Sequence, residues 1–311
     1  MLGSLLMKPM ELEQLASELA RVAAPFIGPG RSFENFGERK ILVDATSKFR
    51  VRDDAGNPEL VVLCLAAGGP EIVARGVQRA RDIAEALGDD LGRAVLLPVG
   101  EGDVDGRTFA IFRYCTPLIE SGPRWWVQRS MVRPRLIRWL IDSSRKTAIA
   151  IPTDSLDRCV YEPLAAMLAD DGHSPELREL AEEALRAARA GEWQPRHVFM
   201  HDDLWSGNVL LDRQSTGNPG RFVVIDWAGA RVRGYPLYDL LRLSATFGLT
   251  RGPFYRALDQ YCDALGYTRV QAGYAFANAA AELGQRLEHW PRQSYLSTID
   301  RCYRKLMNGR D

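Results

Sequence analysis

The chain has 311 residues, of which 46% are hydrophobic and 26% charged, the composition of a globular protein that buries a sizeable core. Forty basic and forty acidic side chains give a formal net charge of zero. Proteins that bind nucleic acid by neutralising its phosphates carry a basic excess, so this balance argues against a nucleic-acid partner.

The first third of the chain predicts a small sheet with one inserted helix. Apolar residues recur at helical spacing between charged residues over 9–24, which predicts an amphipathic helix. The segments that follow predict strands at 41–43, 48–51 and 60–65, a helix over 68–87 that Gly88 closes, and strands at 95–99 and 107–112 around a turn at 102–106.

After Pro117 the apolar pattern becomes mostly helical. Helices are predicted at 133–148, 158–169 and 175–190 and again from Pro236, with short strands at 196–200, 209–211 and 222–225. We therefore expect an α+β fold of two lobes. The β-rich N-terminal lobe would comprise residues 1–117, and the larger, mostly helical C-terminal lobe residues 118–311.

Cysteine usage and apolar runs bear on the location of the protein. Five cysteines lie far apart and form no C-x-x-C pair. This spacing argues against a disulfide framework or a zinc ribbon and favours a reducing compartment. The longest apolar run, residues 60–67, is too short to cross a bilayer. We expect a cytoplasmic protein without membrane association.

The stretch that carries chemistry is His201-Asp-Asp-Leu-Trp-Ser-Gly-Asn208, followed by Val-Ile-Asp226-Trp. If the strands between the two motifs pair as an antiparallel hairpin, Asn208 and Asp226 become neighbours at its open end. An amide oxygen and a carboxylate suit Mg²⁺, which takes few protein ligands and completes its shell with substrate phosphates. Asp203 could then accept the proton of an attacking hydroxyl, as in phosphoryl transfer by kinases.

These motifs, with Gly-Tyr-Pro-Leu-Tyr-Asp239 after them, resemble the aminoglycoside phosphotransferase and choline kinase family of small-molecule kinases. The Leu-Trp-Ser-Gly-Asn wording is also similar to that of fructosamine kinases. The resemblance, specific between residues 199 and 243, implies a bilobal protein-kinase-like fold, ATP or another nucleoside triphosphate as donor, and Mg²⁺. It implies these roles: a brace at His201, the catalytic base at Asp203, metal ligands at Asn208 and Asp226, and a helix anchor at Asp239.

Three residues near this motif have competing interpretations. Asp202 replaces the glycine usual in the family, and it is either an accessory acid or substrate contact, or a tolerated surface charge. Trp205 is expected to pack rather than to stack on an acceptor. His197 lies four residues before His201, a separation of roughly 13 Å along a strand, which is too far for one ion and argues against a zinc site.

The N-terminal lobe departs from the resemblance where the nucleotide phosphates should bind. In this fold the third strand normally carries a lysine that pairs with a helix glutamate. Aligning the strands puts Cys64 at the lysine position and Gly76 at the glutamate position, with Glu71 and Glu85 as alternatives. The phosphate loop, residues 44–49, contains no glycine.

Two explanations of this departure remain open. In the first, Lys48, one of only five lysines, reaches into the phosphate site beside Ser47 from the neighbouring strand, helped by Arg75 or Arg79. In the second, the lobe has lost tight ATP binding or uses another phosphate donor. Adenine would lie against the connection at 112–117, where backbone groups of Tyr114 and Cys115 supply hydrogen bonds.

We therefore predict a phosphotransferase that moves the γ-phosphate of a nucleoside triphosphate to a hydroxyl of a sugar, amino alcohol or antibiotic. The alternative is a catalytically impaired kinase-fold protein that binds nucleotide or another ligand. The acceptor pocket is expected to use the polar residues of 281–290, and Arg231 and Arg233 are candidates for contacts with an anionic acceptor or phosphate. The zero net charge weakens the aminoglycoside alternative, and the sequence leaves the oligomeric state undetermined.

Overall fold

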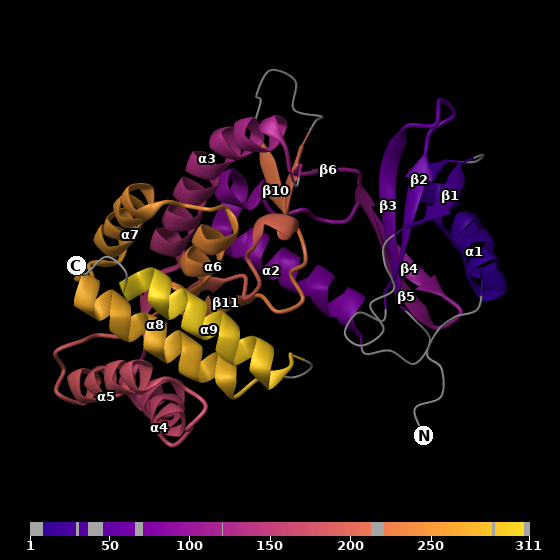
Figure 1. Cartoon of the computed structure of the whole chain (residues 1–311). Helices are drawn as coiled ribbons and strands as arrows, with labels where there is room; N and C mark the ends of the chain where they lie inside the picture. The colour runs from indigo at the N-terminus through magenta and orange to yellow at the C-terminus, as the bar shows by residue number, and fades with distance from the viewer. Residues whose placement is uncertain are drawn as a thin grey trace.

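The computed structural model describes residues 9–28, 31–36, 46–65, 71–119, 121–212, 221–287 and 290–307. Within these ranges the chain forms a small lobe around a five-stranded sheet and a larger helical lobe beside it (Figure 1). The predicted α+β fold with these two lobes is confirmed. The strand predicted at 41–43 and the predicted start of the inserted helix at 68–70 lie outside the described residues.

Five antiparallel strands form the N-terminal sheet, in the order β1-β2-β3-β5-β4. They are β1 (Ser32–Asn35), β2 (Thr46–Arg52), β3 (Pro58–Leu65), β4 (Gly100–Val104) and β5 (Arg107–Arg113). Helix α1 (Pro9–Ile27) packs on one face, where Leu15 and Leu19 meet Phe49 and Val62. Helix α2 (Ile72–Gly92) packs on the opposite face. Because side chains alternate along a strand, each position of β2 and β3 faces one helix or the other.

The strand predicted at 95–99 is wrong, and the structure has β4 at Gly100–Val104 instead. Asp105 and Gly106 both have positive φ, 53° and 68°, and form a two-residue turn that lets Val104 pair with Arg107. The segment predicted as a turn is therefore mostly strand. Val95 forms only an isolated bridge, to Val224 in the C-terminal lobe.

Helix α2 extends beyond its predicted end at Gly88. The helix breaks at this residue, whose φ is 64°, and continues to Gly92. The Nζ atom of Lys146 donates a hydrogen bond of 2.8 Å to the carbonyl of Leu87 at the break. A basic side chain from the C-terminal lobe thus satisfies a carbonyl that the interrupted helix leaves without its usual partner.

Helices dominate the C-terminal lobe. They are α3 (Pro123–Thr147), α4 (Glu162–Leu168), α5 (Pro175–Arg189), α6 (Tyr238–Thr246), α7 (Arg251–Leu265), α8 (Arg269–Gly284) and α9 (Arg292–Met307). Helix α3 begins ten residues before its predicted start at Arg133. A π-helical turn at Asp157–Tyr161 precedes α4. The predicted start of α5 is confirmed, because the Ser174 hydroxyl accepts a hydrogen bond from the backbone N–H of Leu177.

Two small antiparallel sheets hold the functional loops in the C-terminal lobe. One has β8 (Arg196–Met200) between β7 (Ile149–Ala150) and β11 (Arg231–Gly234), and the other has β9 (Val209–Leu211) between β10 (Phe222–Val224) and β6 (Thr116–Pro117). An ion pair of 2.6 Å between Arg113 and the buried Asp212 joins the end of β5 to the end of β9. The β9–β10 hairpin is thereby fixed to the connection between the lobes. The domain boundary after Pro117 stays a prediction.

No helix within the described ranges is long and apolar enough to cross a membrane.

Candidate active site

The β9–β10 hairpin brings the two candidate metal ligands to its open end. Val209 pairs with Val224, and the N–H of Ile225 donates a hydrogen bond of 3.0 Å to the Asn208 carbonyl. The predicted antiparallel pairing is thus confirmed. Asn208 is buried, whereas Asp226, one residue past Ile225, is exposed and has a left-handed φ of 66°. Buried and exposed oxygen donors therefore lie close together at one edge of the hairpin.

His201 is completely buried and connects the two motifs. Its Nδ1 accepts the N–H of Asp203 (3.3 Å), so the proton is on Nε2, which donates to the carbonyl of Ile225 (2.9 Å). Burial lowers the pKa of His201 to about 4, and the ring is neutral near pH 7. Its ring lies 4.5 Å from that of Trp227. The imidazole thus fixes the backbone of Asp203 against the end of the strand that precedes Asp226.

Asp203 is held on both carboxylate oxygens and is still accessible. Oδ1 forms an ion pair with Nη2 of Arg242, and Oδ2 accepts from Nδ2 of Asn208 at 3.3 Å. Nδ2 of Asn208 also donates to the Asp203 carbonyl at 2.9 Å. Burial raises the pKa of Asp203, while Arg242 and Asn208 oppose this rise by stabilising the charged form. Since 49% of the side chain is exposed, a hydroxyl group can reach the carboxylate from outside.

One face of α6 holds the whole 201–208 loop. The buried carboxylate of Asp239 accepts the N–H groups of His201 (2.6 Å) and Asp202 (3.2 Å). Three residues further along, Arg242 pairs with Asp203, and in the next turn the Thr246 hydroxyl accepts the N–H of Ser206 (3.2 Å). Spacings of three and seven residues place Asp239, Arg242 and Thr246 on the same face of the helix. The resemblance implied Asp239 as an anchor, whereas the sequence reasoning missed Arg242 and Thr246, which this spacing could have identified.

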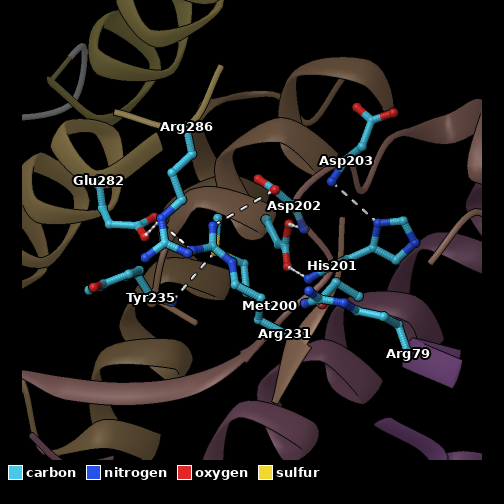
Figure 2. A network of polar contacts seen from close by, with 11 residues as sticks. Arg79, Met200, His201, Asp202, Asp203, Arg231, Tyr235, Glu282 and Arg286 are labelled. Atoms are coloured by element: carbon cyan, nitrogen blue, oxygen red, sulfur yellow. Dashed lines mark hydrogen bonds and ion pairs between the residues drawn. The ribbon is translucent and has the colours of Figure 1, made fainter. Parts of the chain in front are cut away.

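Asp202 is neither free nor a plain surface charge. Its φ of 77° lies in the left-handed region, which explains why glycine suits this position. Its Oδ2 lies 3.8 Å from Nη2 of Arg231, and burial raises its pKa to about 6. Arg231 in turn pairs with Glu282 (2.7 Å), and Glu282 with Arg286 (2.7 Å), as Figure 2 shows. We call these four side chains the arginine–acid chain. It links the 201–208 loop to α8.

On the nucleotide side, the strand register corrects one alignment. Cys64 pairs with Ser47 and is buried in the core that faces α1, so neither position points toward α2. Lys48 pairs with Leu63, and Leu63 packs with Val73 and Val77 of α2. At this point of β3, Leu63 rather than Cys64 therefore faces α2. Lys48, which is half-buried, lies directly beside it on the same face.

The remaining residues predicted for the nucleotide site take varied positions. Gly76 faces the segment after Asp226, because a Cβ placed on it would lie 3.8 Å from the Cβ of Ala228. Arg79 donates a hydrogen bond to the carbonyl of Ala230, so it supports this same segment. The N–H of Tyr114 donates to the carbonyl of Glu59 (2.8 Å) and is not available to an adenine ring. Cys115 is buried with Leu96 and Val223, and burial raises the pKa of its thiol.

Comparison with known proteins shows the family of this chain. A family model described as the phosphotransferase enzyme family matches residues 44–277, which cover most of both lobes. The chain belongs to the phosphotransferase enzyme family. A search of curated proteins found no match.

Solved structures with the fold of this phosphotransferase span nearly the whole chain. A choline/ethanolamine kinase family protein from Mesorhizobium loti is 16% identical, with 96% of each chain covered and a TM-score of 0.50. An ethanolamine kinase from Plasmodium vivax is 11% identical over 97% of this chain and 88% of its own, with a TM-score of 0.52. A protein from Haemophilus somnus described as a fructosamine-3-kinase is 12% identical over 95% and 99%, with a TM-score of 0.54. At these identities the likeness shows the fold, which is that of protein-kinase-like enzymes.

The phosphotransferase family implies a divalent metal, and the residues present fit one. Nδ2 of Asn208 donates to Asp203, so the acceptor atom of the Asn208 side chain is its amide oxygen, Oδ1. Together with the exposed Asp226 it offers hard oxygen donors, the type that Mg²⁺ prefers. The described residues contain no group of three or more His, Cys, Asp or Glu side chains that could hold an ion. A site here would have few protein ligands, and waters or phosphate oxygens of the substrate would complete its shell.

The phosphotransferase structure also shows where Trp205 and His197 lie. Trp205 was expected to pack, but 41% of it is exposed. A Cβ on Gly207 would lie 2.4 Å from the Trp205 ring, so the indole lies over this glycine at the surface of the loop. His197 is buried and its Nδ1 contacts the carbonyl of Gly234 at 3.0 Å. It is a core residue.

Proposed function

We propose that this phosphotransferase transfers the γ-phosphoryl group of ATP, or of another nucleoside triphosphate, to a hydroxyl of a small molecule. The observation that carries the proposal is the position of Asp203. Its carboxylate is oriented by Arg242 and Asn208, is reachable from solvent, and lies beside the open end of the hairpin that presents Asp226. In kinases an aspartate before such a hairpin orients the attacking hydroxyl.

In the proposed reaction Asp203 accepts the proton of the acceptor hydroxyl while the hydroxyl oxygen bonds to the γ-phosphorus. The bond from that phosphorus to the bridging oxygen breaks, and the nucleoside diphosphate leaves. His201 and Asp239 act on this step only through the backbone, because they fix the N–H groups of residues 201–203. Asn208 and Asp226 would hold Mg²⁺, which supplies neutralisation of phosphate charge when bound.

For the nucleotide we propose that Lys48 replaces the absent lysine of the third strand. Lys48 lies on the α2 side of the sheet beside Leu63, so a lysine stem from β2 can serve the phosphates. Ser47 lies on the opposite face and can contribute only through its backbone. Adenine would lie against residues 112–117, where Cys115 and its neighbours offer backbone groups, since the Tyr114 N–H is already used.

The test compares nucleotide consumption and acceptor phosphorylation in the native chain and in Asp203→Asn. This isosteric change keeps the side-chain shape but removes the base, and general base catalysis contributes roughly 100- to 10,000-fold to rate. A matched control is Asp259→Asn, since Asp259 is also half-exposed (46%) and pairs with an arginine, Arg269, away from the loop. Equal turnover in the native chain and in Asp203→Asn would refute the proposal.

A second candidate is a binding protein that has lost catalysis. The observation that favours it is the apolar Leu63 at the strand position that faces α2, where this fold normally has a lysine. This candidate predicts nucleotide binding without turnover for every acceptor. Phosphorylation that disappears in Asp203→Asn would exclude it.

A further inference from the structure

Three acids at or near the proposed base are paired with arginines. Three carboxylates on or against the 201–208 loop, those of Asp202, Asp203 and Glu282, each lie within ion-pair distance of an arginine. A further carboxylate, that of the buried Asp239, accepts backbone N–H groups of the loop. The arginines come from three separate segments: Arg231 from β11, Arg242 from α6 and Arg286 from the segment just after α8. These three acids and three arginines balance one another in charge.

We propose that the acceptor of this phosphotransferase carries no positive charge and is a neutral or anionic hydroxyl compound, such as a sugar or a sugar acid. The inference rests on the proposed function and adds the class of acceptor to it. An ammonium group is stabilised in a pocket by carboxylates that lack another partner or by a negative local potential. Among the acids of this site, Asp202, Asp203 and Glu282 each have an arginine partner, and Asp226 is assigned to the metal.

Burial makes these pairs difficult for a cationic acceptor to exchange. The Glu282 side chain is 3% exposed and that of Arg231 14%, so their 2.7 Å pair lies in a poorly hydrated environment. An ammonium that took over Glu282 would leave the guanidinium of Arg231 buried with only the more distant Asp202, and an unpaired buried charge is strongly disfavoured. The same argument applies to Asp203, whose partner Arg242 is only 21% exposed.

The outer end of the arginine–acid chain adds positive charge. The Nε atom of Arg286 pairs with Glu282 (Figure 2). The Arg286 side chain is 65% exposed. Its two Nη groups can donate to the hydroxyl, carboxylate or phosphate oxygens of a bound molecule. An acceptor ammonium in the same place would meet a like charge, which is the kind of contact that excludes wrong partners.

The zero net charge of the sequence left room for a local acidic pocket that would bind amino alcohols or aminoglycosides. The ion pairs described above argue against such a pocket on this side of the loop. The names of two solved neighbours refer to choline or ethanolamine. At 16% and 11% identity these neighbours show a common fold and no more. The acceptor of this chain is therefore inferred from its own side chains.

Matched acceptors that differ only in charge test the inference. One pair is choline and its carbon analogue, in which a carbon atom replaces the quaternary nitrogen, and the other set is glucosamine, glucose and glucuronate. We expect kcat/KM for the uncharged or anionic members to exceed that for the cationic members by roughly tenfold or more. A ratio of this size corresponds to the effect of about one ion pair in a partly desolvated site. Equal values or a preference for the ammonium compounds would overturn the inference and leave the proposed function intact.

A separate measurement shows whether the proposed function itself fails. In that function, transfer of the phosphoryl group to water also requires the base. Nucleotide hydrolysis without acceptor is measured in the native chain and in Asp203→Asn, and an identical rate in both points to loss of the proposed function itself. In that case the same acceptor pairs are compared as ligands of the nucleotide-loaded protein by thermal shift. A larger shift with neutral or anionic members supports the charge preference, and an equal or smaller one contradicts it.

A variant makes the role of the arginine–acid chain specific. Arg286→Ala removes the exposed guanidinium and leaves one oxygen of Glu282 without its partner. We expect the ratio of kcat/KM for glucosamine to that for glucose to rise by roughly fivefold. Arg304→Ala is the control, because Arg304 is 67% exposed and pairs with Asp300 on α9. A ratio that changes equally in both variants, or in neither, would contradict the role of Arg286.

Discussion

The guanidinium of Arg242, on α6, pairs with the carboxylate of Asp203, the proposed catalytic base. The two residues are 39 positions apart in sequence and meet because Asp239, three residues earlier on α6, binds the backbone of the same loop. Arg242 restricts the rotation of the Asp203 side chain and stabilises its ionised form. We therefore expect Arg242 to position the base for the attacking hydroxyl.

Removing this partner should change both rate and pH dependence. In Arg242→Leu the carboxylate loses the contact that lowers its pKa, so we expect kcat to fall by roughly 10- to 100-fold. The acidic limb of the pH–rate profile should also move to higher pH, because a base with a higher pKa is protonated over a wider range. Arg242→Lys keeps the charge and should restore the position of that limb in part.

A purely structural role of Arg242 would give a different result. Arg269→Leu removes an arginine from an exposed pair with Asp259 and serves as the matched control for loss of a surface ion pair. If Arg242→Leu changes stability in urea but leaves the pH–rate profile in place, Arg242 stabilises the fold and does not position the base.

The strand register predicts which lysine serves the nucleotide. Lys48→Ala should weaken nucleotide binding, measured by thermal shift with Mg²⁺, by roughly tenfold or more, since a charge-assisted contact to a phosphate is lost. Cys64→Ser changes a buried thiol that faces α1, so it should alter stability more than nucleotide affinity. Nucleotide binding that is unaffected by Lys48→Ala would exclude the relocated lysine.

The buried His201 should make the protein less stable in acid. Its pKa is about 4 in the folded chain and 6.5 as the ordinary value, so below pH 6.5 the unfolded chain takes up a proton that the folded chain does not. Stability is therefore full above pH 6.5 and falls as the pH drops toward 4, by an amount on the order of 3 kcal/mol over this range.

Asp239 contributes with the opposite sign over much of the same range, because burial raises its pKa to about 7 from an ordinary 3.8. Its contribution is present at low pH and is lost as the pH rises through 7. The effect of His201 is thus read as the difference between urea unfolding curves of the native chain and of His201→Gln, recorded from pH 4 to 8. Parallel pH dependences in the two proteins would contradict a buried neutral imidazole.

The left-handed backbone at Asp202 predicts an unusual substitution pattern. Asp202→Gly removes an ion pair of 3.8 Å but relieves the positive φ, so we expect the free energy of unfolding to change by less than about 1 kcal/mol. Asp202→Val puts a β-branched side chain at φ 77° and should destabilise the protein by roughly 2 kcal/mol or more. Similar urea midpoints for the two variants would show that backbone conformation does not determine this position.

Local signals predicted much of the fold, and the exceptions have identifiable causes. Helix α5 follows from Ser174 and the apolar spacing after it, and the β9–β10 pairing follows from two β-rich segments around a turn. The strand predicted at 95–99 was wrong because the two-residue turn at Asp105 and Gly106 set the register of β4. A turn of two residues and a turn of five contain the same residue types, and only pairing with the neighbouring strand distinguishes them.

The charge balance argued against a nucleic-acid partner. The motifs between residues 199 and 243, through their resemblance to small-molecule kinases, predicted a kinase-like phosphotransferase fold. The family match and the two-lobed fold confirm that level of description. The sequence also places His201, Asp203, Asn208 and Asp226 near one another, because these residues belong to one loop and one hairpin.

Only the tertiary structure shows which charged side chains form ion pairs. The sequence shows forty acids and forty basic residues but not that Arg242 pairs with Asp203, or that Arg231 and Arg286 enclose Glu282. It also could not show that the pleat of β3 turns Cys64 toward α1 and leaves Leu63 beside Lys48. Ion pairs and strand faces depend on distances of a few ångströms between segments far apart in the chain. Only the packing of helices and strands within each lobe sets these distances.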